Sequence, residues 1–166
     1  CEKTNSSKVA LVSTSAGAYM SVKALERLKK QHIEVPKLVL LSPAAYPEEI
    51  EDVPYGEKFS EILRESWDIA ESPVFSRLER YVADGGSVFI SFFESDDPPI
   101  PQKIQEYYKS FAHRLSENGG AISVTTIPGV AHNFRRIGAA KNKNVVDNDS
   151  VRTTAVLLND FLKMDE

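Results

Sequence analysis

The sequence predicts an α/β fold in which a parallel sheet of about four strands is covered by flanking helices. Four short apolar runs are the strand candidates: 8–13, 37–42, 87–93 and 121–127. They are largely apolar rather than strictly alternating, which is typical of strands buried on both faces of a parallel sheet. Amphipathic helical patterns lie between them. This alternation predicts right-handed crossovers between parallel strands that lie side by side in chain order.

The first strand, 8–13 (KVALVS), is followed by a helix that ends near Lys29-Lys30. Its apolar residues recur at spacings of four and three and form one face: Ala18, Val22, Leu25 and Leu28. The second strand, 37–42 (KLVLLS), comes next. The order of the elements places strand 8–13 at one edge of the sheet, where its outer backbone groups have no partner strand.

The connection 43–86 is unusually long for a compact domain. It contains Trp67, scattered aromatic residues and the four prolines Pro43, Pro47, Pro54 and Pro73. Long connections are usually functional lids or disordered, and the aromatic content argues against disorder. We predict short helices at 57–66 and 76–83 that form a cap or lid. In the alternative interpretation these aromatic residues simply cover the sheet.

The third strand, 87–93 (SVFISFF), and the fourth, 121–127 (AISVTTI), are each followed by a helix. The helix after the third strand carries apolar residues at Ile104, Tyr108, Phe111 and Leu115 and is predicted to end at 118–120. The last helix is predicted to begin after an N-cap at Asp149-Ser150 and has the apolar residues Val151, Ala155, Leu158 and Leu162.

The composition indicates one soluble domain over 1–166. Apolar residues make up 42% of the chain, and the net charge is −4 without a basic run longer than two residues, which argues against nucleic-acid binding. The single cysteine and three histidines favour neither a disulfide nor a zinc site, and we expect no cofactor and no membrane span. A cytoplasmic location is expected; in the alternative, Cys1 is the lipid-bearing start of a secreted lipoprotein.

The strongest local signal is the turn from the first strand into the first helix. Small residues surround a serine there, in the order Ser13-Thr14-Ser15-Ala16-Gly17. This arrangement is typical of a nucleophile elbow, G-x-S-x-G, in which a strained turn raises the serine hydroxyl above the sheet. Gly17 fits the second glycine of the pattern, whereas Ser13 replaces the first.

Acids and a histidine follow the next strand ends. The third strand ends in Glu94-Ser95-Asp96-Asp97, and His132 follows the fourth in PGVAHNF. The order Ser, Asp, His resembles that of the α/β-hydrolase superfamily from about residue 8 to the last helix. The run 42–47 (SPAAYP) makes the chain most similar to the branch of small esterases and dienelactone-hydrolase-like enzymes.

The resemblance implies roles for these residues. Ser15 would be the nucleophile, His132 the general base, and an aspartate would orient His132. Counting from the strand favours Asp96 as this acid, and counting back from Ile100-Pro101 favours Asp97. The Ala16 N–H would give one oxyanion-hole donor. His32 and His113 are expected to be structural.

The resemblance covers only the C-terminal half of such a hydrolase. The loop that supplies the second oxyanion-hole donor in the family is not found in this sequence, so we expect weak activity from this chain alone. We expect a missing N-terminal segment or another chain against strand 8–13. Two functions remain open: a serine hydrolase acting on a small ester, less readily a thioester or amide, and a non-catalytic α/β-hydrolase-like binding module.

Overall fold

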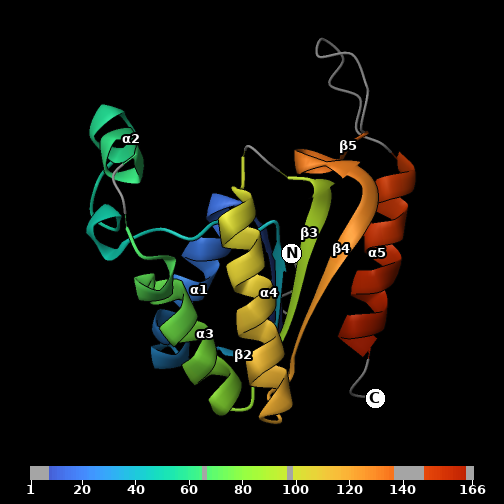
Figure 1. Ribbon diagram of the computed structural model, residues 1–166. Coiled ribbons are helices and arrows are strands. Elements are labelled where there is room, and N and C mark those ends of the chain that lie inside the picture. Colours follow the sequence, from blue (N-terminus) through green and yellow to red (C-terminus); the bar gives the residue numbers. More distant parts are fainter. Residues whose placement is uncertain (1–7, 65–66, 97–98, 137–147, 164–166) are drawn as a thin grey trace, which may run out of the picture.

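The computed structural model describes residues 8–64, 67–96, 99–136 and 148–163. Its centre is one five-stranded sheet whose strands lie in chain order: β1 (Lys8–Thr14), β2 (Glu34–Leu41), β3 (Ser87–Ser95), β4 (Ile122–Ala131) and β5 (Arg135–Arg136) (Figure 1). The first four strands are parallel, and the two-residue β5 is antiparallel to β4. The predicted fold class, strand order and strand direction are therefore confirmed.

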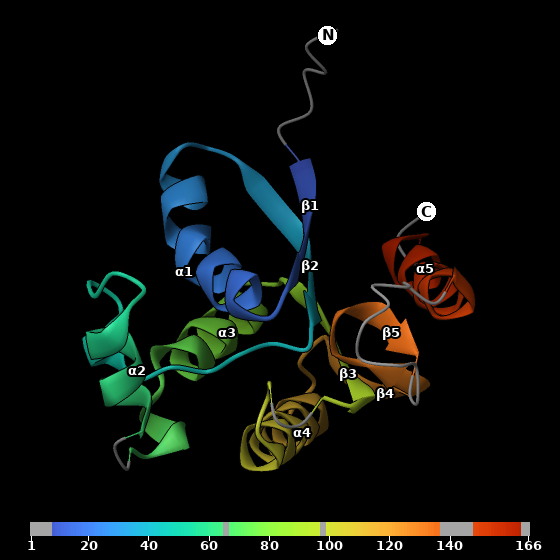
Figure 2. The ribbon, with the colours of Figure 1, turned by 90° about the horizontal axis from the view of Figure 1, so that it is seen from above.

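Helices cover both faces of the sheet (Figure 2). On one face lie α1 (Ala16–Lys30), α3 (Pro73–Ala83) and α4 (Gln102–Glu117), and on the other lies α5 (Asn148–Lys163). The larger core is formed by the α1, α3 and α4 face, with Val22, Leu40, Leu78, Ile90 and Tyr108 among its buried side chains. The smaller core joins α5 to β2 and β3 through Val39, Leu41, Phe89, Leu158 and Phe161. The first and last helices, α1 and α5, thus cover opposite faces.

The connection between β2 and β3 has two parts. It contains η1 (Glu48–Ile50), α2 (Glu57–Arg64), η2 (Ile69–Glu71) and then α3. In Figure 1, α2 lies apart from the sheet, whereas α3 packs beside α1. Leu78 of α3 is fully buried in the larger core. Thus α3 is the crossover helix between two neighbouring strands, and the segment before it is the part that stands outside the helix layer.

Several predicted boundaries were wrong for identifiable reasons. Strand β2 begins at Glu34, three residues early, because 34–36 run beside β1 only and β3 joins at Lys37. Strand β4 continues to Ala131, where it pairs with Ser95 beyond a register shift. Asp149-Ser150 does not precede α5 but lies in its first turn, since α5 begins at Asn148. The short strand β5 was not predicted.

Strand β1 is an edge strand, as predicted. In the part of the chain that the structure describes, β1 pairs with β2 alone. The side chains of Val9 and Val12 are 37% and 51% exposed, in contrast to β2, whose last five residues are all buried. The β1 edge of the sheet is therefore more exposed than β2, its neighbour in the interior.

Candidate active site

Ser15 forms the whole connection between β1 and α1. Its backbone has φ 53° and ψ −127°, a conformation that costs free energy in any residue with a side chain. Its N–H donates to the Leu41 carbonyl (2.9 Å), and its own carbonyl accepts from Ala18 N–H (3.0 Å) and Ala44 N–H (3.2 Å). The neighbours Ala16 and Gly17 are small, which lets helix and strand meet at so sharp a turn. This backbone has the features of a nucleophile elbow.

Asp96 lies directly after β3 and is fully buried. Its Oδ1 lies 2.8 Å from Nδ1 of His132. Its Oδ2 accepts two hydrogen bonds, from the Ser42 hydroxyl (2.7 Å) and from the Phe93 N–H (2.6 Å). A buried carboxylate is stable only when its oxygens are satisfied in this way. The arrangement suits an ionised Asp96 that accepts a proton-bearing Nδ1 and leaves Nε2 of His132 as an acceptor.

His132 begins the short helix η3 (His132–Phe134) directly after β4, and its side chain is 11% exposed. The end of β4 that precedes it is fixed to β3, because Gly129 N–H donates to the Glu94 carboxylate (2.6 Å). Gly129 has φ 74°, which a glycine adopts without strain. After His132, the ring of Phe134 packs edge-on against the ring of Phe93, with the two ring centroids 4.9 Å apart. His132 is therefore held from both sides.

Ser15, Ser42, Asp96 and His132 follow β1, β2, β3 and β4 in that order, so all four lie at the carboxyl edge of the sheet. Active sites of open α/β sheets form at this edge. The structure brings Asp96 and His132 into contact. Ser15 lies at the same edge, without a hydrogen bond to His132 among the described residues; such bonds are often long before substrate binds.

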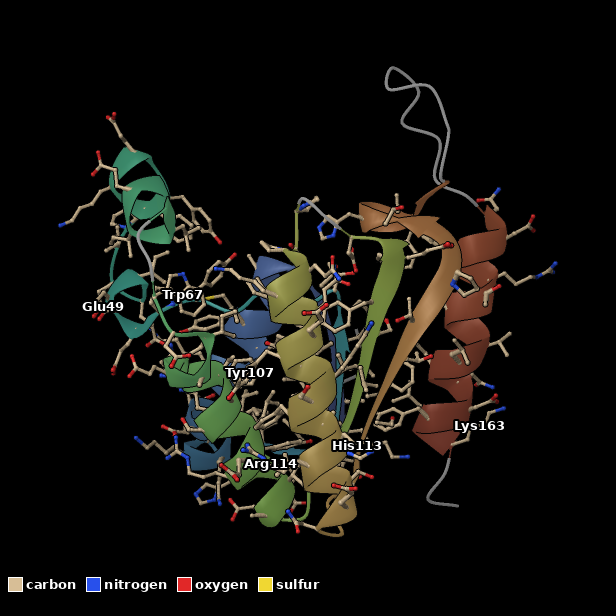
Figure 3. The ribbon with its side chains drawn as sticks, viewed as in Figure 1. Glu49, Trp67, Tyr107, His113, Arg114 and Lys163 are labelled. Atoms are coloured by element: carbon tan, nitrogen blue, oxygen red, sulfur yellow. The ribbon has the colours of Figure 1, made fainter. Side chains whose placement is uncertain are left out.

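The other sequence-predicted residues are placed as follows. Ala16 is the first residue of α1, so its N–H has no acceptor within the helix. Asp97 lies outside the described residues. His113 is exposed near the C-terminal end of α4, far from the carboxyl edge (Figure 3), and lies 3.4 Å from Glu117. His32 follows α1 with φ 59°.

Sequence reasoning missed the residues that hold Asp96 and the histidine loop. Ser42 is part of the run SPAAYP, which carries the family resemblance, but the run itself predicts no role for this serine. Its hydrogen bond to Asp96 depends on a positive φ of 47° and on the β2–β3 register, neither of which a sequence pattern reveals. Glu94 was noted only as a neighbour of Asp96.

Among the described residues there is neither a metal-binding cluster nor a membrane-spanning helix. No group of three or more His, Cys, Asp or Glu side chains there is placed to hold a metal ion. None of the helices described combines the length and apolar character needed to cross a membrane.

Solved structures resemble this chain at low sequence identity. Esterase 2 of Thermogutta terrifontis phosphonylated by sarin matches with a TM-score of 0.60 and 18% identity over 92% of this chain and 55% of that one. The apo form of the same esterase matches with a TM-score of 0.57 and 17% identity over 92% of this chain and 54% of that one. Its propionate-bound form matches with a TM-score of 0.54 and 17% identity over 93% of this chain and 54% of that one. No family model and no curated protein matches.

The chain spans about half the length of these esterases. At this level of identity the likeness establishes the fold alone. The sheet of four parallel strands with flanking helices is therefore an α/β-hydrolase-type architecture, and the structural neighbours are esterases.

Proposed function

We propose that this chain carries the Ser-His-Asp residues of a serine hydrolase that cleaves small carboxylic esters. The observation that carries the proposal is the 2.8 Å contact between buried Asp96 and His132, at the same sheet edge as Ser15 in its positive-φ turn. The esterase neighbours support it, since one is described as phosphonylated by sarin and another as propionate-bound. Small acyl groups are accordingly the first substrates to test.

The proposed reaction proceeds through an acyl-enzyme. Nε2 of His132 takes the proton of the Ser15 hydroxyl as its oxygen attacks the ester carbonyl, and Asp96 stabilises the resulting imidazolium. The Ala16 N–H donates to the oxyanion. His132 then protonates the leaving alcohol as the C–O bond breaks. A water molecule, deprotonated by the same Nε2, then attacks the acyl carbonyl; the bond between the acyl carbon and the Ser15 oxygen breaks, the acid leaves, and His132 returns the proton to the Ser15 oxygen.

We further propose that the second oxyanion donor comes from polypeptide of an α/β-hydrolase domain that pairs with β1. Most exposed large apolar side chains of the described residues lie on β1 and α5: Val9, Val12, Val151, Val156, Leu157 and Leu162. An edge strand with exposed apolar side chains is a natural pairing site. The neighbours carry additional chain of about the size of this one, which fits such an addition.

A non-catalytic binding module is the second candidate. Ser13 stands where the elbow pattern has glycine, and its hydroxyl reaches only the Val39 carbonyl at 3.4 Å. A module that binds esters or acids without turnover would keep the fold and the Asp96–His132 pair but would show no rate dependence on Ser15.

Hydrolysis of p-nitrophenyl acetate, propionate and butyrate distinguishes the two. The protein is compared with Ser15→Ala and with Ser21→Ala, a control on the same helix. We expect hydrolysis that Ser15→Ala abolishes and Ser21→Ala retains. If the second oxyanion donor comes from other polypeptide, as proposed, the absolute rate of the chain alone is low, because loss of one donor costs about 10²–10³ in rate. Equal rates in all three proteins would contradict the proposal. Ester binding without any Ser15-dependent turnover would favour the binding module.

A further inference from the structure

We propose that Ser42 is a positioning residue for the acid–base pair: its hydroxyl fixes the Asp96 carboxylate in the orientation that His132 needs. The inference rests on the proposed function, in which Asp96 orients His132. It adds a fourth side chain to the three in the Ser-His-Asp order and assigns it a task that the sequence pattern does not contain.

The contacts of Ser42 place it at the centre of the carboxyl edge. It follows β2 directly and is fully buried. Its hydroxyl donates to Asp96 Oδ2 at 2.7 Å, and its N–H donates to the Ser91 carbonyl of β3 at 2.7 Å. Ser42 also directly follows Leu41, the last residue of β2, whose carbonyl accepts the Ser15 N–H. It thus lies between the nucleophile turn and the acid.

The backbone of Ser42 is strained. Its φ of 47° is one that glycine adopts freely and a residue with a side chain does not. Glycine would therefore be the more stable choice for the turn itself. What the serine adds is a hydroxyl that, among the described residues, is the only side-chain donor to Asp96 Oδ2. Strain kept at such a position is typical of functional sites.

The hydroxyl matters because it fixes the carboxylate plane. Without it, Oδ2 retains the Phe93 N–H alone, and the carboxylate is held less firmly against rotation about its Cβ–Cγ bond. The contact between Oδ1 and Nδ1 of His132 is then maintained for a smaller fraction of the time. The neutral imidazole must keep its proton on Nδ1 so that Nε2 is free to take the Ser15 proton. A less firmly held Asp96 weakens this tautomer preference.

A second buried serine provides a matched control. Ser91 is also fully buried and lies on the neighbouring strand β3. Its side-chain oxygen has no hydrogen-bond partner among the described residues. Ser91→Ala thus removes a buried hydroxyl close to Ser42 without touching Asp96. Any general effect of deleting a buried hydroxyl should appear in both variants, whereas a positioning effect should appear only at Ser42.

The test compares Ser42→Ala, Ser42→Gly and Ser91→Ala with the parent protein in ester hydrolysis. We expect both Ser42 variants to lose about tenfold to a hundredfold in kcat with KM unchanged, the range given by hydrogen bonds to charged groups. Ser91→Ala should retain kcat. Ser42→Gly should melt no lower than Ser42→Ala, because it removes the strained φ. If Ser42→Gly retained full kcat, the hydroxyl would have no positioning role and the proposal would be overturned.

A second readout does not need turnover. In protein labelled with ¹⁵N-histidine, the ¹⁵N shifts of His132 report which ring nitrogen carries the proton. We expect the Nδ1–H tautomer in the parent and in Ser91→Ala, and a mixture of tautomers in both Ser42 variants. An unchanged tautomer in both Ser42 variants would contradict the positioning role. A shifted tautomer in a protein without Ser15-dependent hydrolysis would instead support the positioning role while the proposed function failed.

Discussion

The two halves of the proposed site differ in how deeply their residues are buried and in how many neighbouring strands support them. On the side of β3 and β4, Asp96 is fully buried, both its oxygens are bonded, and His132 is 11% exposed. On the side of β1, Ser15 is half-buried and follows a strand that, among the described residues, has one neighbour. Its turn is held by three backbone hydrogen bonds, to Leu41, Ala18 and Ala44.

This difference shows which part of the chemistry the chain organises by itself. The acid–base pair depends on strands in the interior of the sheet, so its geometry follows from the fold. Ser15, the proposed nucleophile, depends on an edge strand and on α1, so its position is sensitive to changes at β1. Substitutions of the acid–base residues should therefore lower activity with little effect on stability, whereas substitutions at the Ser15 turn and around α1 should also change stability.

The largest effect is expected on the acid–base side. Asp96→Asn cannot accept a proton-bearing Nδ1 in the same way and should lower kcat by about 10⁴, as in the serine-protease triad from which this magnitude is taken. The melting temperature should change far less than kcat. Asp97→Asn is the matched control, because sequence reasoning left both aspartates open. If Asp97→Asn abolished hydrolysis and Asp96→Asn spared it, the assignment of the acid would be wrong.

A cluster around Glu51 should give the next largest effect, on stability. Glu51 follows η1 and accepts from Tyr19 (2.6 Å), Lys23 (2.8 Å) and Arg77, so it joins the helix after Ser15 to α3. Burial acts to raise the pKa of Glu51, but hydrogen bonds from Arg77, Lys23 and Tyr19 outweigh it and lower the pKa to about 2 from the ordinary 4.5. We expect Glu51→Gln to lower the free energy of unfolding by about 2–3 kcal/mol in urea titrations.

The same cluster predicts an acid dependence. Because the folded-state pKa is depressed, the contribution of Glu51 to stability is complete above about pH 4.5 and is lost as the pH falls towards about 2. The parent should lose stability more steeply over this window than Glu51→Gln. Arg80→Ala is the control: Arg80 pairs with Glu26 between the same two helices, but both side chains are more than half exposed. Its effect should stay below about 1 kcal/mol; equal losses in the two variants would remove the special role of Glu51.

The smallest effect is expected on the stability of the Ser15 turn, as distinct from the activity that the Ser15 hydroxyl provides. Both Ser15→Gly and Ser15→Ala remove the proposed nucleophile and should be inactive. Only glycine also relieves the φ of 53°, so Ser15→Gly should be more stable than Ser15→Ala by about 1 kcal/mol. Thermal unfolding of the two variants measures this difference. A more stable alanine variant would show that the turn is not strained.

The sequence predicts the interior of this molecule better than its edges and loops. The apolar runs and helical spacings sufficed for β1 to β4, α1, α4 and the order of the sheet. For β2 and β3 the reason is burial on both faces, which leaves a clear pattern, whereas β1 kept an apolar run although none of its residues is buried. Strand β5 and the extension of β4 through Pro128-Gly129 had no such pattern, since they depend on pairing around the His132 loop. Ser42 could not be assigned because its role arises from a single backbone angle and a contact across two strands.

The most direct test of the account is covalent labelling by a fluorophosphonate, with the modified residue mapped by mass spectrometry after proteolysis. We predict one phosphonyl group, on Ser15, and no labelling of Ser15→Ala. Labelling should slow strongly in His132→Ala, since deprotonation of Ser15 then lacks its base, and should persist in Ser21→Ala. Modification that survives Ser15→Ala, or that maps to another residue, would contradict the assignment of Ser15 as the nucleophile.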